Sequence, residues 1–260
     1  MDSTLLINSI NRKQPTSSVS DKENRHLAEV YKDFSAQKKE NRYIQLLHPC
    51  SVTSKSSHSG AILPPISLAY LAATLRGAGY PVKIIEAQGD DIFKIRLSEC
   101  GDYNIQGLST EEIIARIKPE TKILGVTLLY SYEWLIQRDV IKAIKARFPK
   151  IIIVVGGEHP TALPEYVLRD CPEVDFIVSG EGEFTLLQLV SSIFYSKEFR
   201  SIPGISYINK KGQFASNGLS SRIAHIDDIP RPAWDLCNVE NYFQPNWSMG
   251  IGLGRNMPIN

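Results

Sequence analysis

The feature that most constrains the fold is a series of short runs that are apolar at consecutive positions. The run IIIVV at 151–155 is one of them, and it does not alternate with polar residues. A strand with one wet face alternates, so an unbroken apolar run fits a parallel strand that helices cover on both faces. We expect such strands at five places: 43–48, 82–87, 122–128, 150–155 and 174–179.

Segments with helical periodicity alternate with these runs. In the first, Leu68, Leu71 and Leu75 recur at helical spacing after Pro64-Pro65. The other expected helices lie at 109–117, 132–148, 163–169 and 183–195. This alternation predicts an α/β protein with right-handed crossovers. We expect a flavodoxin-like (Rossmann-like) five-stranded parallel sheet in the order 2-1-3-4-5.

The chain divides into three parts on its composition. Residues 1–42 form a polar N-terminal extension, and 43–200 form the α/β domain. In 201–260, GISYINKKGQFASN predicts a β-hairpin with a Lys-Gly turn, followed by an extended linker rich in Pro, Gly and aromatic residues.

Composition and charge exclude several classes of protein. The net charge of +1 gives no reason to expect nucleic acid or an anionic membrane as a partner. No apolar run approaches the roughly 20 residues of a membrane helix, and the N-terminus lacks the pattern of a signal peptide. We therefore expect a cytoplasmic protein.

Cysteine and histidine spacing gives no support for a metal site. Cys50, Cys100, Cys171 and Cys237 are scattered, without a C-x-x-C pair. No H-x-H or H-x-x-x-H pair is present, so we expect no metal ligands from this chain.

Two glycine turns directly follow the fourth and fifth expected strands. Glycine at a strand end permits either a sharp backbone turn or the close approach of a ligand, and the sequence leaves both readings open. In open α/β sheets, ligands bind outside the carboxyl ends of the strands. The candidate cofactor-binding residues at this rim are Leu129, Tyr130, Ser131, Gly156, Gly157, Glu158, His159, Thr161, Gly180, Glu181 and Gly182.

The rim offers no nucleophile with an evident base, so we assign no catalytic residue. Glu181 and Glu183 could act as acid and base, or could interact with the dipole of the helix that they precede. His159 could contact a ligand or bond to the backbone.

Several ordered motifs resemble those of a known family. They are PPISLAYLAATLRGAGYPVKIIEA, ILGVTLLYSYEW, VVGGEHPTALPEYVL and VDFIVSGEGEFTLLQL. In this order and spacing they resemble the cobalamin-binding domain at the front of cobalamin-dependent radical SAM enzymes. PGISY and IDDIPRPAWDL resemble the hairpin and linker that lead into the catalytic barrel of those enzymes.

The resemblance implies cobalamin as the cofactor and a radical SAM barrel, C-terminal to this chain, as the partner domain. The corrin ring is wide, flat and edged with amide side chains, and the loops after the fourth and fifth strands must come close to it. A dimethylbenzimidazole tail displaced from cobalt would enter a groove beside the sheet. Methyl transfer and related radical chemistry share this front domain.

Two departures from the family pattern matter. The D-x-H-x-x-G motif, which supplies a histidine to cobalt in other cobalamin proteins, is absent after the first strand, where the sequence is HPCSVTSKSSHSG. A C-x-x-x-C-x-x-C motif is also absent. We therefore expect the 4Fe-4S cluster and S-adenosylmethionine only in a longer chain, and no radical chemistry from this chain alone.

Three other interpretations remain. SVTSKSSHSG resembles a hydroxyl-rich phosphate loop, as in a flavin or nucleotide binder, although Pro64-Pro65 separates it from the helix start. A signalling receiver would need acidic residues at the ends of the first and third strands, where His48 and Leu129 lie. A ligand-free scaffold that docks a partner domain is the last.

Overall fold

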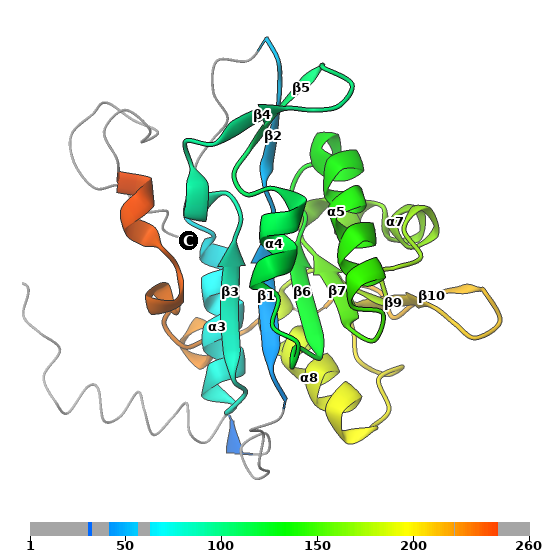
Figure 1. Cartoon of the computed structure of the whole chain (residues 1–260). Helices are drawn as coiled ribbons and strands as arrows, with labels where there is room; N and C mark the ends of the chain where they lie inside the picture. Colours follow the sequence, from blue (N-terminus) through cyan, green and yellow to red (C-terminus); the bar gives the residue numbers. More distant parts are fainter. Residues whose placement is uncertain (1–30, 33–41, 57–62, 221, 244–260) are drawn as a thin grey trace, which may run out of the picture.

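The computed structural model describes residues 31–32, 42–56, 63–220 and 222–243 (Figure 1). Most of the predicted N-terminal extension, His58 and the end of the predicted linker lie outside these residues.

The main sheet confirms the predicted α/β class. Its parallel strands are β1 (Ile44–His48), β3 (Val82–Glu86), β6 (Ile123–Thr127), β7 (Ile152–Gly156) and β8 (Phe176–Val178). They lie side by side as β3-β1-β6-β7-β8, which is 2-1-3-4-5 when they are numbered along the chain.

The predicted hairpin extends this sheet rather than standing apart from it. Its strands are β9 (Ile205–Ile208) and β10 (Phe214–Ser216). β9 pairs antiparallel with β8, so the sheet has seven strands instead of the five expected. The edge of β8 therefore finds its hydrogen-bond partners within the chain.

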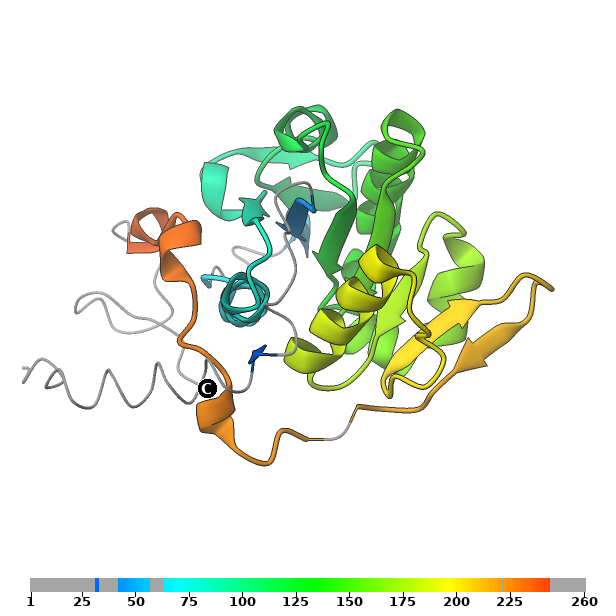
Figure 2. The same ribbon diagram turned by 90° about the horizontal axis from the view of Figure 1, so that it is seen from below.

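Helices cover both faces of the sheet (Figure 2). α3 (Ile66–Gly77) and α8 (Gly182–Tyr195) pack on one face through a core that includes Leu68, Leu75 and Leu187. The opposite face carries α4 (Thr110–Arg116), α5 (Trp134–Arg147) and α7 (Pro164–Asp170), with the short α6 (Glu158–Ala162) beside β7. Burial on both faces explains why the strands are apolar at consecutive positions.

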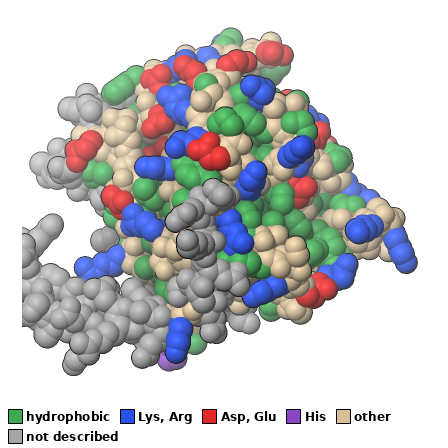
Figure 3. Space-filling view, turned by 60° about the horizontal axis from the view of Figure 1, so that its bottom comes forward, with side chains coloured by type: hydrophobic (Ala, Val, Ile, Leu, Met, Phe, Trp, Pro, Cys, Tyr) green, Lys and Arg blue, Asp and Glu red, His purple; other side chains and the backbone are tan. Residues whose placement is uncertain are grey.

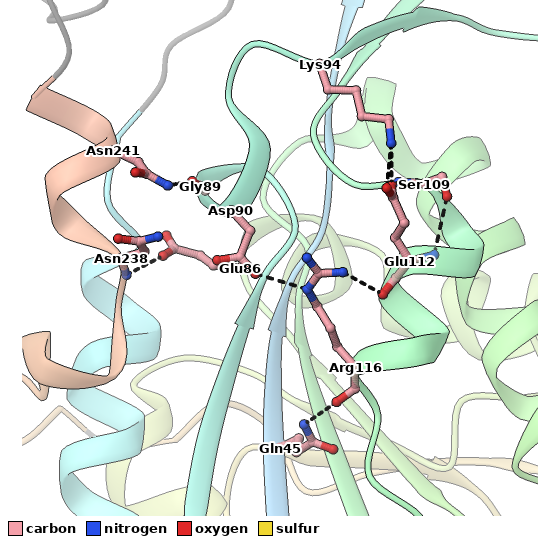
Figure 4. A network of polar contacts seen from close by, with 10 residues as sticks. All are labelled: Gln45, Glu86, Gly89, Asp90, Lys94, Ser109, Glu112, Arg116, Asn238 and Asn241. Atoms are coloured by element: carbon pink, nitrogen blue, oxygen red, sulfur yellow. Dashed lines mark hydrogen bonds and ion pairs between the residues drawn. The ribbon is translucent and has the colours of Figure 1, made fainter.

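A capping box begins α4. The Ser109 hydroxyl accepts a hydrogen bond from the Glu112 backbone at 3.3 Å, and the Glu112 carboxylate accepts one from the Ser109 backbone at 2.7 Å. Ser109, the first residue of the helix expected at 109–117, is therefore the N-cap. Lys94 also reaches Glu112 (Figure 4) and is the main reason that the pKa of this carboxyl falls to about 2.

A second, small sheet was not expected. It consists of β2 (Ser51–Ser54), β4 (Ile95–Leu97) and β5 (Tyr103–Gln106), in the antiparallel order β2-β5-β4. No strand was expected at 51–54, so the sequence analysis missed β2. Strands of three or four residues with several polar side chains give too little periodicity to be recognised.

After the hairpin, the chain returns across α3. It forms three short 3-10 turns, η4 (Ile226–Asp228), η5 (Trp234–Leu236) and η6 (Val239–Phe243). We call residues 233–243 the linker strap. The Ala233 backbone donates to the Ala69 carbonyl at 2.9 Å, and Arg76 pairs with Asp235 at 2.6 Å.

The end of the linker strap binds to the carboxyl end of β3 (Figure 4). The Tyr242 hydroxyl donates to the buried Glu86 carboxylate, which also accepts from the Asn238 backbone at 3.2 Å. Asn241 donates to the carbonyl of Gly89, in η2 (Gly89–Asp91), at 2.7 Å. Burial raises the pKa of Glu86 to about 7.

The raised pKa of Glu86 makes stability depend on pH. The folded state holds the Glu86 proton more tightly than the unfolded state, so the stabilisation is complete below about pH 4.5 and is lost as pH rises through about 7. We expect the free energy of unfolding to fall over this window by on the order of 2 to 3 kcal/mol. Glu86→Gln should flatten the profile in urea unfolding at pH 5, 6, 7 and 8.

The exposed Glu120 supplies the matched control, because its side chain is 58% accessible. Glu120→Gln should keep the wild-type pH profile. Identical profiles for wild type and Glu86→Gln would contradict the role of Glu86.

Candidate cofactor-binding site

A groove opens beside the carboxyl half of the sheet, between α3 and α8. Its volume is about 250 Å³. Helix α3 supplies Ser67, Leu68 and Leu71 to its walls, and α8 supplies Gly182, Glu183 and Leu186. Its remaining lining residues come from the strands and the loops that follow them: Leu46, Gly125, Val126, Thr127, Leu129, Val154, Val155, Gly156, Gly157, Glu158, Val178, Gly180 and Glu181. We call it the α3–α8 groove.

Three glycines keep the walls of the α3–α8 groove close together. A Cβ atom at Gly125 would lie 2.7 Å from the Leu46 side chain, and one at Gly182 would lie 3.2 Å from Leu71. A Cβ at Gly156 would lie 3.2 Å from the carbonyl oxygen of Val178. At these positions, larger side chains would therefore compete for the space of the groove.

Gly157 has a different reason to be glycine. Its φ of 113° and ψ of −175° lie in a region that only glycine adopts readily. A Cβ there would lie 2.5 Å from the Leu128 carbonyl oxygen, which is backbone. Of the two interpretations that the sequence left open, the tight turn explains Gly157. Gly156 and Gly182 line the groove, where Val178 and Leu71 lie close to the position of an added Cβ.

The loop after β6 exposes apolar side chains at the rim. Leu129 is 37% exposed, Tyr130 50% and Tyr132 59%. The two tyrosine rings stack, with centroids 5.4 Å apart and planes at 16°. Tyr132 lies in η3 (Ser131–Glu133), which leads into α5. This loop offers a flat apolar surface next to the mouth of the groove.

His159 lies behind the rim. It is 3% exposed, and its ring centroid is 5.1 Å from that of Trp134. Its Nδ1 is 2.9 Å from the Ser131 hydroxyl, and burial lowers its pKa, so the ring is neutral near pH 7. The alternatives that the sequence offered were a ligand contact and a backbone bond. Nδ1 bonds to a side chain rather than to the backbone, and the ligand contact stays a prediction.

The structure brings together seven of the eleven candidate residues in the α3–α8 groove: Leu129, Gly156, Gly157, Glu158, Gly180, Glu181 and Gly182. Tyr130 lines a neighbouring cavity. Ser131, His159 and Thr161 line neither cavity.

Sequence reasoning missed Leu46, Gly125 and Leu71, which line the groove from two strands and a helix. A glycine in the middle of a strand often marks the close approach of a ligand or backbone. Gly125 inside KILGVTL was therefore the signal that could have found this wall.

The two acids near the start of α8 have different surroundings. The Glu181 carboxylate accepts a hydrogen bond from the Ile223 backbone, which ties it to the segment before the linker strap. Glu183 lies in the first turn of α8, and burial raises its pKa.

The rest of the described surface gives no sign of a metal site or a membrane span. Among these residues, no three His, Cys, Asp or Glu side chains gather in a way that could hold a metal ion. No helix in the described part is long and apolar enough to cross a bilayer. On the face shown in Figure 3, acidic and basic side chains occur side by side.

The topology and the groove at the strand ends define a ligand-binding α/β domain of the flavodoxin-like kind. The family model described as the B12 binding domain matches residues 56–190, which is more than half of the 260 residues. The chain therefore belongs to the B12-binding domain family, and the predicted family and its cofactor, cobalamin, are confirmed.

Two curated relatives are longer than this chain. An uncharacterized methyltransferase of Pyrococcus horikoshii is 30% identical over 77% of this chain and 40% of its own length. The cytidylyl-2-hydroxyethylphosphonate methyltransferase of Streptomyces wedmorensis is 25% identical over 69% of this chain and 38% of its own length. The chain thus spans about two fifths of these two relatives.

A solved structure shares the fold. It is the cobalamin-dependent S-adenosylmethionine radical enzyme OxsB with aqua-cobalamin and S-adenosylmethionine bound, at a TM-score of 0.60 and 20% identity, over 76% of this chain and 25% of that one. This domain is similar to the B12-binding domain of cobalamin-dependent radical SAM enzymes.

The backbone requirement at Gly157 can be tested by substitution. Gly157→Ala should destabilise the fold by about 3 kcal/mol or more, because the new Cβ adds a clash to an unfavourable φ. Gly212 is the matched control, since its φ is 74° and nothing lies within 4 Å of its Cβ position. Gly212→Ala should cost about 1 kcal/mol in urea unfolding. Equal losses would contradict the close approach to Leu128.

Proposed function

We propose that this chain is the cobalamin-holding front part of a longer radical SAM enzyme. The corrin lies over the rim formed by the loops after β6, β7 and β8, and its nucleotide tail enters the α3–α8 groove. In this proposal, residues 43–200 hold the cofactor, and 201–260 connect them to a C-terminal radical SAM barrel. The observation that carries the proposal is the groove at the strand ends, lined by Gly125, Gly156 and Gly182, in a B12-binding domain.

The residues present fit the tail of cobalamin. Leu46, Leu71 and Leu186 make the groove walls largely apolar, which suits a flat heteroaromatic base. Gly180 and Gly182 bring backbone N–H groups to the start of the 14-residue helix α8, where a phosphate or a carbonyl is favourable. A cavity of about 250 Å³ agrees with a ligand group that reaches in from the rim.

Bound cobalamin supplies a cobalt centre that can carry a methyl group. This chain's contribution is to hold and orient the cofactor. Leu129 and the stacked Tyr130 and Tyr132 offer apolar surface at the rim without a strong metal ligand. None of the described residues is assigned a catalytic role, and the 4Fe-4S cluster and S-adenosylmethionine belong to the remainder of the longer enzyme.

The placement of the tail can be tested with two corrinoids. Protein mixed with hydroxocobalamin and desalted should retain corrin absorbance near one equivalent. Leu71→Trp fills the groove and should weaken cobalamin binding at least tenfold, but it should change little for cobinamide, which lacks the nucleotide. Ile226→Trp is the control, because Ile226 is 73% exposed and lines neither cavity.

Retention of flavin with no corrin would contradict the proposal and favour a flavin binder. If Leu71→Trp weakened the binding of cobalamin and cobinamide equally, the placement of the nucleotide tail in the groove would be wrong.

The environment of cobalt gives a second test. Because no histidine sits in a D-x-H-x-x-G context, the cobalt(II) EPR spectrum of the bound cofactor should lack nitrogen splitting. The spectrum should stay the same in His48→Ala, His58→Ala and His159→Ala. Splitting that disappears in one variant would identify a histidine ligand. Splitting that persists in all of them would show that the nucleotide base stays on cobalt, outside the groove.

A further inference from the structure

A second cavity adjoins the α3–α8 groove, where the loops after β1 and β6 separate. Its volume is about 170 Å³, and we call it the switch-point pocket. It shares Ser67, Thr127 and Leu129 with the groove, so the two cavities open on the same rim. Its lining includes the buried polar side chains of Glu133 and Gln137 and the partly buried His48.

The side-chain oxygen of Gln137 is an unused hydrogen-bond acceptor among the described residues. Its side-chain nitrogen donates to Glu133 Oε2 at 3.1 Å, and the residue is only 4% exposed. A carboxylate can only accept, so this bond fixes the amide with its nitrogen toward Glu133. Gln137 Oε1 is buried and has no hydrogen-bond partner among the residues that the structure describes. A buried carbonyl oxygen in this state is incomplete until a donor reaches it.

Glu133 adds acceptor capacity beside Gln137. Its Oε1 accepts from the Val52 backbone at 2.8 Å, and the Ser51 side chain also bonds to the carboxylate. With the Gln137 bond, three of the roughly four lone-pair sites are used, which leaves room for a further donor. Burial raises the pKa of Glu133, because the charged carboxylate has lost water. A further N–H donor would stabilise the charged form.

His48 supplies a further unused nitrogen. Its Nδ1 is buried without a hydrogen-bond partner among the described residues, and the Glu86 carboxylate is 4.0 Å away, beyond hydrogen-bond distance. Burial lowers its pKa to about 4, so the ring is neutral near pH 7. A neutral ring can donate or accept at Nδ1, according to its tautomer.

These groups select one kind of ligand. Acceptors on Gln137 and Glu133 require N–H or O–H donors, and the buried carboxylate repels an anion. A primary carboxamide has two N–H donors and one carbonyl, which could meet both acceptors and the His48 ring. Resting on the proposed function, we infer that the switch-point pocket binds one carboxamide side arm of the corrin ring.

This site would make the domain selective for the finished cofactor. If the bound amide is replaced by a carboxylic acid, two donors are lost and a negative charge is placed beside Glu133. Such a ligand should bind at least tenfold more weakly, which corresponds to about 1.4 kcal/mol. Loss of an amide elsewhere on the ring should matter much less, because those arms lie outside the pocket.

The test uses a series of cobalamins in which a single carboxamide arm is hydrolysed to the acid. The affinity of the wild-type chain for each is measured at pH 8 by absorbance titration, with cobalamin as the reference. We expect one derivative to bind at least tenfold more weakly and the others to stay within about threefold. In Gln137→Met, which keeps the side-chain length but removes the amide, cobalamin should bind more weakly and the selectivity against that derivative should shrink.

Gln213→Met is the matched control, since Gln213 lies in the hairpin and away from both cavities. It should keep both the affinity and the selectivity of the wild type. Equal affinity of the wild type for all derivatives would overturn the inference, as would undiminished selectivity in a folded Gln137→Met. The ligand series on the wild-type chain decides the question even if that variant does not fold. If no corrinoid binds, the proposed function itself fails, which is a different result from binding without selectivity.

Discussion

The structure depends on the parallel pairing of β1 with a neighbour on each side. β1 pairs with β3 on one edge and with β6 on the other, so the chain must leave β1 and β6 toward opposite faces of the sheet. α3 follows β1 onto one face, and α5 follows β6 onto the other. The two connecting loops therefore separate at their base and cannot fill the space between them. The α3–α8 groove and the switch-point pocket both open at this edge of the sheet.

How far the sequence predicts this molecule depends on how local each signal is. Unbroken apolar runs and helical spacing identified every parallel strand and the main helices, because burial on both faces leaves a direct mark on composition. The strand at Ser51–Ser54 was missed because its stability comes from partners about 50 residues away. The surroundings of His159 could not be predicted either. Its neighbours Ser131 and Trp134 come from η3 and the start of α5, and their approach is a result of tertiary packing.

In the candidate site, too, the sequence shows where a glycine lies but not what its role is. Gly156 and Gly157 are adjacent in sequence and look equivalent there, yet Gly156 lies close to the Val178 carbonyl in ordinary backbone conformation, whereas Gly157 has a positive φ and lies against Leu128. Only φ and the nearest atoms separate these roles. Gly125 was the more informative residue, since a strand interior gains little from glycine unless something must lie against it. The sequence therefore predicted most of the rim residues of the α3–α8 groove but missed its wall residues Leu46, Gly125 and Leu71.

The linker strap has a consequence for whatever is joined to it. Glu86 and Gly89 hold Tyr242 and Asn241 at the carboxyl end of β3, at the same edge of the sheet as the α3–α8 groove. A polypeptide that continues from Phe243 would start from that fixed point instead of from the end of a free coil. Short tethers of this kind keep an attached domain at an effective concentration in the millimolar range. This domain and the attached domain would then meet within one molecule, at a rate that does not depend on the protein concentration.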